Sequence, residues 1–316
     1  MHDPLISIII PIFNRAHVVK ETLDSIKKQS YKNWECIIVD DGSEDDIEKV
    51  IAQYSEEDVR FQFYRRPKNR LKGANSCRNY GFTQSKGDLI KWFDSDDIML
   101  SHHLEIASKT LIRNKLDFVI TSSLNFDSNT KEFLGEHFVF DRKKAEITAE
   151  NLALNKIGWI TDDFLGTREI VENITFNEEI FYGDEYNFFI KLLHQHFSGC
   201  FINEIVTHRR IHIDSITSES TKNEIYFEKI ITALKFQTAR DLVIYDDKKL
   251  IRWFLAGYMR YSFQLGIRKA SIPFFIPAFK LICRYYSIAK GMAFLVALLG
   301  AKYFNKGYKI MLYARK

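Results

Sequence analysis

The stretch Trp92-Phe93-Asp94-Ser95-Asp96-Asp97 decides the fold of this chain. The preceding residues 89–91 continue into Trp92 and Phe93 as a short apolar run with an aromatic end, which is typical of a buried strand. Three carboxylates follow where such a strand leaves its sheet, and neighbouring negative charges raise one another's pKa. A hard divalent cation, Mn²⁺ or Mg²⁺, prefers oxygen ligands and removes this repulsion. The alternative is a solvated acidic turn that caps the next helix.

The composition is that of an ordinary globular protein, with 46% hydrophobic and 27% charged residues among 316. This length allows one or two domains with a sizeable core. The sequence contains four cysteines, Cys36, Cys77, Cys200 and Cys283. Because they have neither metal-like nor paired spacing, they favour a reducing, cytoplasmic setting. No uncharged run approaches the roughly 18 residues of a spanning helix. The apolar run 5–13 is short and lacks a basic flank, so we expect neither a signal peptide nor an integral membrane protein.

Strands and helices alternate through the first part of the sequence. Apolar runs predict strands at 5–10, 34–39, 61–64, 89–93 and 118–121. Helical spacing predicts helices at 19–29, 47–54, 73–84 and 104–114. This alternation predicts right-handed βαβ units and a parallel sheet, in which ligands bind beyond the carboxyl ends of the strands. Asp40-Asp41 and Asp94-Ser95-Asp96 both stand at such ends.

Four blocks, read in order, resemble the family 2 glycosyltransferases with the GT-A fold, of the bacterial cell-surface polysaccharide type. The blocks are Ser7–Arg15, Val39–Ser43, Ala74–Gly81 and Asp94–Asp97. Their order and spacing agree over roughly residues 4–215. The resemblance implies an α/β, Rossmann-like, mixed and mainly parallel sheet flanked by helices. It also implies a nucleotide-sugar donor such as a UDP-sugar, a divalent cation, Mn²⁺ or Mg²⁺, and inversion at the anomeric carbon.

The expected domain organisation follows from these blocks. A GT-A catalytic domain is predicted at 1–220, with a nucleotide-binding half at about 1–123 and an acceptor half at about 124–220. A mainly helical, basic C-terminal region is predicted at 221–316.

The resemblance also implies the donor side of the site. Pro11 and Phe13 would form a wall for the base or ribose, with Asn14 beside them, and Asp40 would read the base by accepting from the uracil N3–H. Asp41 would shape the loop, with an Asx-type turn as its alternative.

The phosphate and metal side would use the residues around the acidic stretch. Arg78 would neutralise phosphate or orient Asp94, and Ser95 would also lie at the donor. Asp96 is the expected metal ligand, while Asp94 would contact the ribose or the hydrated cation. The segment Arg209–Thr217 resembles the family's Arg-x-His segment, in which His212 would complete the metal shell or bind phosphate together with Arg210.

The acceptor side would begin at an acidic pair that opens an amphipathic helix. Residues 176–179 and 181–192 resemble the family's acceptor block. In that block the acidic pair is usually Glu-Asp, and the second acid is the general base. Here the order is reversed to Asp184-Glu185. The register assigns the base to Glu185 and leaves Asp184 as the other choice. The alternative is that both acids favour the helix N-terminus through its dipole. Trp159 and Thr161–Asp163 are expected to face the acceptor.

The C-terminal region carries a different charge. Ile251–Lys316 contains twelve Lys and Arg and no Asp or Glu, whereas the rest holds 33 basic and 41 acidic residues. Its basic residues recur at helical spacing. On a helix, Lys302, Lys306 and Lys309 would form one stripe, and Lys280 and Arg284 would do the same a few turns earlier. Apolar helices with basic flanks lie in membrane interfaces. We expect an anionic membrane surface as partner; solvated bases on helices packed against the catalytic domain are the alternative.

The expected function is metal-assisted, inverting transfer of a sugar to a hydroxyl of a saccharide or polyprenyl-linked saccharide acceptor. The expected place is the cytoplasmic face of the inner membrane, bound peripherally, with no nucleic-acid partner. A sugar nucleotidyltransferase is an alternative, but it usually has a Gly-rich loop after the first strand, and Pro11–Arg15 contains no glycine. An inactive nucleotide-sugar-binding membrane scaffold is another alternative, but it would not need both acidic sites.

Overall fold

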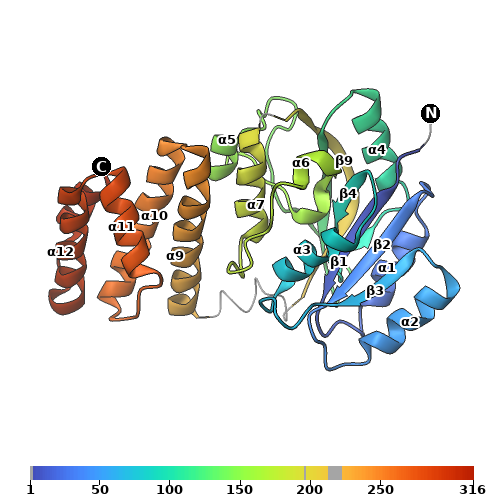
Figure 1. The fold of residues 1–316 in the computed structure, drawn as a ribbon, viewed down its shortest axis with the longest axis horizontal. Coiled ribbons are helices and arrows are strands. Elements are labelled where there is room, and N and C mark those ends of the chain that lie inside the picture. The colour runs from blue at the N-terminus through green and yellow to red at the C-terminus, as the bar shows by residue number, and fades with distance from the viewer. Residues whose placement is uncertain (1–2, 196, 213–222) are drawn as a thin grey trace. The chain divides into compact units, whose positions relative to one another are not determined.

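The chain is described by a computed structural model that covers residues 3–195, 197–212 and 223–316. It divides into two compact units, Met1–His212 and Ile213–Lys316, each with its own internal packing (Figure 1). The predicted domain boundary at 220/221 lies outside the described residues. The division of the chain into catalytic and C-terminal parts as drawn from the sequence therefore stays a prediction.

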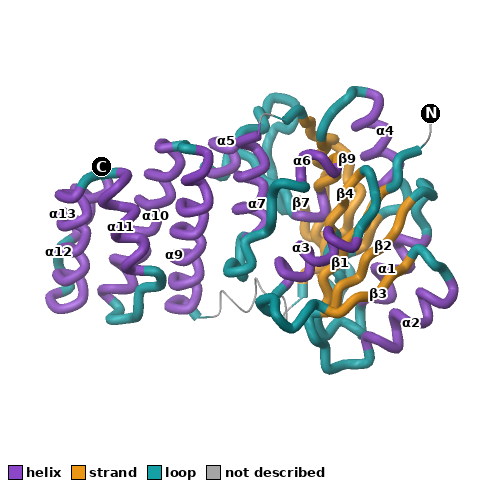
Figure 2. The backbone as a smooth tube through the Cα atoms, viewed as in Figure 1, coloured by secondary structure: helices purple, strands orange, loops and turns teal. Residues whose placement is uncertain are grey.

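The first unit is built on one mixed sheet flanked by helices (Figure 2), as expected for the α/β class. The strands lie in the order β3-β2-β1-β4-β8-β6-β9-β5, and β7 pairs with β6. Their bounds are β1 Ile6–Ile12, β2 Trp34–Asp40, β3 Phe61–Arg65, β4 Leu89–Trp92, β5 Ile98–Met99, β6 Phe118–Asp127, β7 Phe133–Glu136, β8 Phe164–Thr167 and β9 Gly199–Ile211. The helices are α1 Val19–Lys27, α2 Ile47–Glu57, α3 Ala74–Gln84, α4 His103–Arg113, α5 Ala149–Ala153, α6 Arg168–Val171 and α7 Asp184–Leu192, with short 3₁₀ turns η1 Thr161–Asp163 and η2 Leu193–Gln195.

The parallel part of the sheet forms where the apolar runs predict it. All seven residues of β1 are buried, as are those of β2, because these strands have helices on both faces. β1 pairs in parallel with β2 on one side and with β4 on the other. The carboxyl ends of β2 and β4 therefore lie at the same edge, and Asp40 and Asp94 emerge there.

The antiparallel part is where the sequence gives less guidance. β8 pairs antiparallel with β4 and with β6, although no strand is predicted at Phe164–Thr167. Four residues are too few to show a period, and the pairing partners lie far away in sequence. As a result η1, which directly precedes β8, is brought beside the end of β4. This placement matters for the site.

Helix α3 lies close against the parallel strands because of one glycine. A Cβ added at Gly81 would lie 2.5 Å from Ile9 Cγ2 and 3.2 Å from Val39 Cγ2. The missing side chain lets the helix backbone approach both β1 and β2. Gly81 thus sets the height of α3 above the sheet.

The second unit is helical in its described part, with η3 (Leu242–Tyr245) as its one 3₁₀ turn. Its helices are α9 Glu224–Asp241, α10 Lys248–Ile267, α11 Phe275–Tyr285, α12 Ile288–Phe304 and α13 Tyr308–Arg315. α10 is the central helix, since it packs against α9, α11, α12 and α13. Across the described chain, we find no helix with the length and apolar character needed to cross a membrane.

One prediction for this unit is wrong. Lys302, Lys306 and Lys309 do not form one helical stripe, because α12 ends at Phe304 and α13 begins at Tyr308. The backbone turns left-handed at Asn305 (φ 53°) and again at Gly307 (φ 110°), which ends the helix. Lys280 and Arg284 do share one helix, α11.

We expect Gly81→Ala to lower the free energy of unfolding by about 1–3 kcal/mol, because the added methyl group overpacks the contact between α3 and the sheet. Urea denaturation followed by circular dichroism measures this. The control is Thr83→Ala at an exposed position of the same helix, which should change stability by no more than about 0.5 kcal/mol. Equal stability of Gly81→Ala and wild type would show that α3 is not held at this height by Gly81.

Candidate active site

The three carboxylates that follow β4 lie in three different environments. The amide of Phe93 still donates to the Ile9 carbonyl (3.0 Å), so the parallel pairing continues to the start of the stretch. The side chain of Asp94 is 42% exposed and that of Asp96 is 20% exposed, whereas Asp97 is buried. The first two acids can therefore meet a ligand, and the third cannot.

Arg78 of α3 joins the acid after β4 to the acid that opens α7. Its Nη2 donates to Asp94 Oδ1 (2.9 Å) and its Nη1 donates to Asp184 Oδ2 (2.5 Å). Burial alone would lower the pKa of Arg78, but the charges of Asp184 and Asp94 outweigh it and raise that pKa. The guanidinium is therefore a fixed, permanently charged link between the two expected halves of the site.

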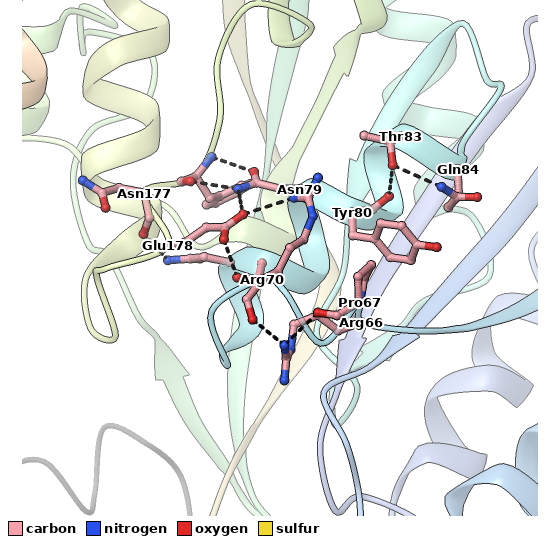
Figure 3. Close-up of polar contacts among 12 residues, drawn as sticks. Arg66, Pro67, Arg70, Asn79, Tyr80, Thr83, Gln84, Asn177 and Glu178 are labelled. Atoms are coloured by element: carbon pink, nitrogen blue, oxygen red, sulfur yellow. Dashed lines mark hydrogen bonds and ion pairs between the residues drawn. The ribbon is translucent and has the colours of Figure 1, made fainter.

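Helix α3 also holds the segment that leads into α7 (Figure 3). Asn75 Nδ2 donates to the carbonyls of Asn177 (3.0 Å) and Ile180 (2.8 Å). Asn79 forms two hydrogen bonds with the backbone of Phe176, both 2.9 Å. These contacts fix where α7 starts.

Glu178 completes this clamp with its side chain. It accepts from three groups of α3 and its preceding loop: Ser76 Oγ (2.7 Å), Asn79 Nδ2 (3.0 Å) and Arg70 Nη1 (3.2 Å). Of the block Ala74–Gly81, only Arg78 was predicted as a site residue, and the clamping residues were not. Their small polar side chains at helical spacing were the available signal.

The acidic pair at the start of α7 is split into two roles by its surroundings. Gly183 precedes it in the left-handed conformation (φ 70°), and both acids stand in the first helical turn. Asp184 is bound to Arg78, whereas Glu185 is next to it without that ion pair among the described contacts. Burial, followed by the charge of Asp184, raises the pKa of Glu185 to about 8. In many enzymes, two neighbouring carboxyl groups with different environments have different pKa values and take different acid–base roles.

Asp96 and His212 come together as expected for the metal side. His212 Nε2 lies 2.9 Å from Asp96 Oδ2, and Arg15 Nε lies 3.5 Å from the same oxygen. Burial acts to raise the pKa of Asp96, but the hydrogen bond from His212 and the charge of Arg15 outweigh it and lower that pKa. Residues 213–217 of the predicted Arg-x-His segment lie outside the described residues.

A second acidic group joins Asp94 to two buried acids. Within the described ranges, one group of three possible metal-ligating side chains has its ligand atoms within 4.8 Å of one another: Asp94, Asp97 and Asp162. Asp97 Oδ1 accepts from the Arg210 amide (2.7 Å), and Asp162 Oδ1 accepts from the Asp94 amide (2.9 Å). Burial and the neighbouring acids raise the pKa of both Asp97 and Asp162. The predicted trio of Asp94, Asp96 and His212 does not close into one such group.

The expectation that Trp159 and Thr161–Asp163 face an acceptor is wrong, because all four residues are buried. Asp162 is fully buried against the end of β4, so it does not face an acceptor. Trp159 is 2% exposed, and its ring packs against Phe189 and Phe201 at centroid distances of 5.2 and 5.9 Å. Both residues support the site from behind.

Arg210 is also a supporting residue. Its Nε donates to the Asp96 carbonyl (2.7 Å) and its Nη2 donates to Glu21 Oε2 (2.8 Å). The side chain is 1% exposed, so its guanidinium does not present itself to a phosphate as expected. It fixes the backbone of Asp96 instead. Ser95 is buried beside it, with its carbonyl accepting from Thr22 Oγ1 (3.1 Å).

The loops after β1 and β2 form the remaining wall. The Phe13 ring is partly exposed, with Lys72 Nζ 4.0 Å from its centroid, whereas Pro11 is buried within β1. Asn14 (φ 51°) ties the two loops together, donating from its amide to Ser43 Oγ and accepting at Oδ1 from the Glu44 amide, both 2.8 Å.

The Asx-type turn that was the alternative for Asp41 is made by its neighbour. The Asx-type turn belongs to Asp40, whose Oδ1 accepts from the Ser43 amide (3.0 Å). Asp41 instead forms an ion pair with Arg66. Base reading by Asp40 stays a prediction.

Comparison with known proteins gives two informative curated relatives. A Campylobacter jejuni GalNAc(5)-diNAcBac-PP-undecaprenol beta-1,3-glucosyltransferase is 28% identical over 224 residues, covering 70% of this chain and 69% of that protein. The Escherichia coli UDP-Glc:alpha-D-GlcNAc-diphosphoundecaprenol beta-1,3-glucosyltransferase WfgD is 31% identical over 119 residues, covering 38% of this chain and 46% of that protein.

Solved structures share the fold. Staphylococcus aureus TarS 1-349 in complex with UDP-GlcNAc matches with a TM-score of 0.66 at 15% identity, over 98% of this chain and 89% of that chain. The mannosyltransferase PcManGT from Pyrobaculum calidifontis, in complex with GDP-Man and Mn²⁺, matches with a TM-score of 0.55 at 15% identity, over 97% and 89%.

The family comparison covers the four sequence blocks and the segment that leads into α7, and it ends just before that helix. The family model described as "Glycosyl transferase family 2" matches residues 7–182, more than half of the chain. The chain therefore belongs to glycosyl transferase family 2 and is a glycosyltransferase.

Proposed function

We propose that the chain transfers a sugar from a UDP-sugar to a hydroxyl of a lipid-linked saccharide, with inversion and with the help of a divalent cation. The observation that carries this proposal is the double ion pair of Arg78. It holds Asp94, on the donor side, and Asp184, on the acceptor side, in one fixed relation. Membership of glycosyl transferase family 2 argues against the nucleotidyltransferase alternative.

The exposed acids fit a cation better than the buried ones do. A cation that also binds a diphosphate must be reachable, and Asp97 and Asp162 are 3% and 0% exposed. Asp96 and His212, 2.9 Å apart, offer carboxylate oxygen and imidazole nitrogen at the partly exposed side. Carboxylate suits Mg²⁺ and Mn²⁺. A bound cation would neutralise charge on the departing diphosphate.

The acceptor chemistry needs a base and no enzyme nucleophile. In an inverting transfer, the acceptor oxygen bonds to the anomeric carbon as the bond from that carbon to the diphosphate oxygen breaks. The hydroxyl proton passes to a carboxylate, and UDP leaves with the electron pair of the broken bond. We assign the base to Glu185, because Asp184 is already committed to Arg78. A pKa of about 8 makes the ionised Glu185 carboxylate a stronger proton acceptor than an ordinary glutamate, and the base form becomes the major one only above that pH.

The acceptor class comes from the two named relatives. The names of the Campylobacter jejuni and Escherichia coli enzymes both state an undecaprenol-diphosphate-linked acceptor, and the second also names UDP-Glc. By analogy, we propose a polyprenyl-diphosphate-linked saccharide acceptor for this chain. Such an acceptor would require the enzyme to work at the cytoplasmic face of a membrane, bound peripherally.

We expect UDP to raise the melting temperature of the wild type only when Mn²⁺ or Mg²⁺ is present. Asp96→Asn should abolish this metal-dependent shift without changing the melting temperature of the free protein by more than about 2–4 °C, because it removes a ligand charge at a partly exposed position. Thermal denaturation with and without metal measures both. Asp46→Asn, at an exposed acid, is the matched control and should keep the shift. An unchanged shift in Asp96→Asn would remove this residue from the metal site.

We expect Glu185→Gln to retain UDP binding but to lower turnover by about 10²–10⁴-fold, the usual contribution of a positioned proton acceptor. A screen of UDP-sugars with polyprenyl-diphosphate-linked saccharides gives the turnover. Asp184→Asn is the informative comparison, since it should also disturb Arg78 and weaken donor binding. If Asp184→Asn alone is inactive with donor binding intact, the two roles must be exchanged. If neither variant loses turnover, the acid pair is not the base.

Glu185 should also make stability depend on pH. Its pKa of about 8 in the folded state lies above the ordinary carboxyl value of 4.5, so folding favours the protonated form. That stabilisation is complete below about pH 4.5 and is lost as the pH rises through 8. In Glu185→Gln the side chain is neutral at every pH, so this variant keeps the stabilisation at high pH.

We therefore expect Glu185→Gln to match the wild type in stability near pH 5 and to exceed it by about 1–3 kcal/mol at pH 9. Chemical denaturation without added nucleotide or metal, at both pH values, measures the difference. Glu172→Gln, at an exposed position of the same unit, should stay within about 0.5 kcal/mol of wild type at both. A variant less stable than wild type at pH 9 would contradict the assignment.

A further inference from the structure

Helix α12 has two apolar faces, and only one of them is covered by its own unit. The first face consists of buried residues where α12 packs against α10, α11 and α13: Gly291, Phe294, Ala297, Leu298 and Ala301. The second consists of large hydrophobic residues that are between 47% and 74% exposed: Ile288, Met292, Val296, Leu299 and Tyr303. Their spacing of three and four residues places them in a single line along the helix. We call these five residues the α12 row.

The extent of this face distinguishes it from scattered surface hydrophobics. Single exposed apolar residues are normal, but a continuous exposed line marks an interaction site. From Gly291 to Ala301 the helix contains no polar or charged side chain. A helix that is apolar all round is typically buried on all sides or placed against lipid. Figure 2 shows α12 within the second unit, next to α11 and α13.

The charges around the α12 row are of one sign. Lys290 and Lys302 are the charged residues of α12 and stand near its two ends, and Lys306 and Lys309 follow. Lys290 Nζ lies 3.5 Å from the ring centroid of Tyr313, and Lys302 Nζ lies 5.7 Å from that of Tyr303. No Asp or Glu occurs in 251–316. A partner for this face must therefore be apolar at its centre and anionic around it.

We infer that the α12 row docks the enzyme onto an anionic lipid surface, with α12 lying in the plane of the interface. At 1.5 Å per residue the row is roughly 22 Å long, enough to lie along the surface. Its side chains enter the boundary between headgroups and acyl chains, and the exposed Lys302, Lys306 and Lys309 at the C-terminal end of the row reach the lipid phosphates, whereas Lys290 is bound to the Tyr313 carbonyl. This inference deepens the proposed function, because a polyprenyl-linked acceptor is presented at such a surface.

A second copy of the chain is the competing occupant, and the charges disfavour it. Two chains joined through their α12 rows would place Lys302, Lys306 and Lys309 of both chains around one contact. The segment 251–316 offers no carboxylate to pair with them. Like charges at close range oppose such a contact. An anionic lipid surface neutralises the same lysines.

The test is co-sedimentation of the full-length protein with vesicles, without donor or acceptor. Wild type should bind vesicles of phosphatidylcholine with 30% phosphatidylglycerol, and bind pure phosphatidylcholine at least tenfold more weakly. The triple variant Met292→Ser/Val296→Ser/Leu299→Ser should lose tenfold or more in affinity for the anionic vesicles. Lys302→Gln should lose about fivefold, the usual effect of one surface-proximal charge.

The control is the triple variant Val59→Ser/Val139→Ser/Ile244→Ser, which replaces residues that are 86%, 88% and 80% exposed outside α12. It should bind as wild type. Circular dichroism melting confirms that all variants fold, and UDP-dependent thermal shifts report the donor site separately. Equal binding of the α12 variant and wild type, or equal binding of wild type to neutral and anionic vesicles, would overturn the inference. So would a wild-type dimer in sedimentation equilibrium that the α12 variant dissolves while vesicle binding is unchanged.

Discussion

The pair of ion pairs made by Arg78 is the constraint on which the site depends. One buried guanidinium, carried by α3, binds Asp94 after β4 and Asp184 at the start of α7. A planar guanidinium holds two carboxylates in a defined geometry, which a lysine could not. Removing the guanidinium would leave two carboxylates without their shared counter-charge. The relation between the end of β4 and the start of α7 is thus set by electrostatics as well as by the sheet.

Burial then sorts the other acids into different roles. Asp97 and Asp162 lie behind the site, where the loss of hydration raises their pKa values and hydrogen bonds to backbone amides tie the loops together. Asp96 is partly exposed, and His212 and Arg15 lower its pKa. Glu185 is next to Asp184 and keeps a raised pKa. A cation or a proton acceptor would be expected only where the carboxylate is reachable, which favours the partly exposed Asp96 and Glu185 over the buried Asp97 and Asp162.

The parallel strands could be predicted because each is a continuous apolar run, and the acids at their ends follow directly. β8 could not, since Phe164–Thr167 is too short to show a period, and the position of Asp162 depends on it. The contact of Arg78 with Asp184 spans 106 residues and leaves no local signal. The resemblance to the family suggested that His212 lies near Asp96, and the two side chains are in contact. It also suggested a phosphate contact for Arg210, but the guanidinium of Arg210 is bound to Glu21. The stripe of Lys302, Lys306 and Lys309 failed because two left-handed residues end α12.

Helix α3 carries both a packing residue, Gly81, and a site residue, Arg78. Gly81 fixes the distance of α3 from β1 and β2, and Arg78 stands three residues earlier on the same helix. A helix lifted by a side chain at Gly81 would carry the guanidinium away from Asp94 and, through Asn75 and Asn79, would also shift the segment that starts α7. Both halves of the site would then move with a single change in the core. The glycine therefore belongs to the site as much as to the fold, although it touches no ligand.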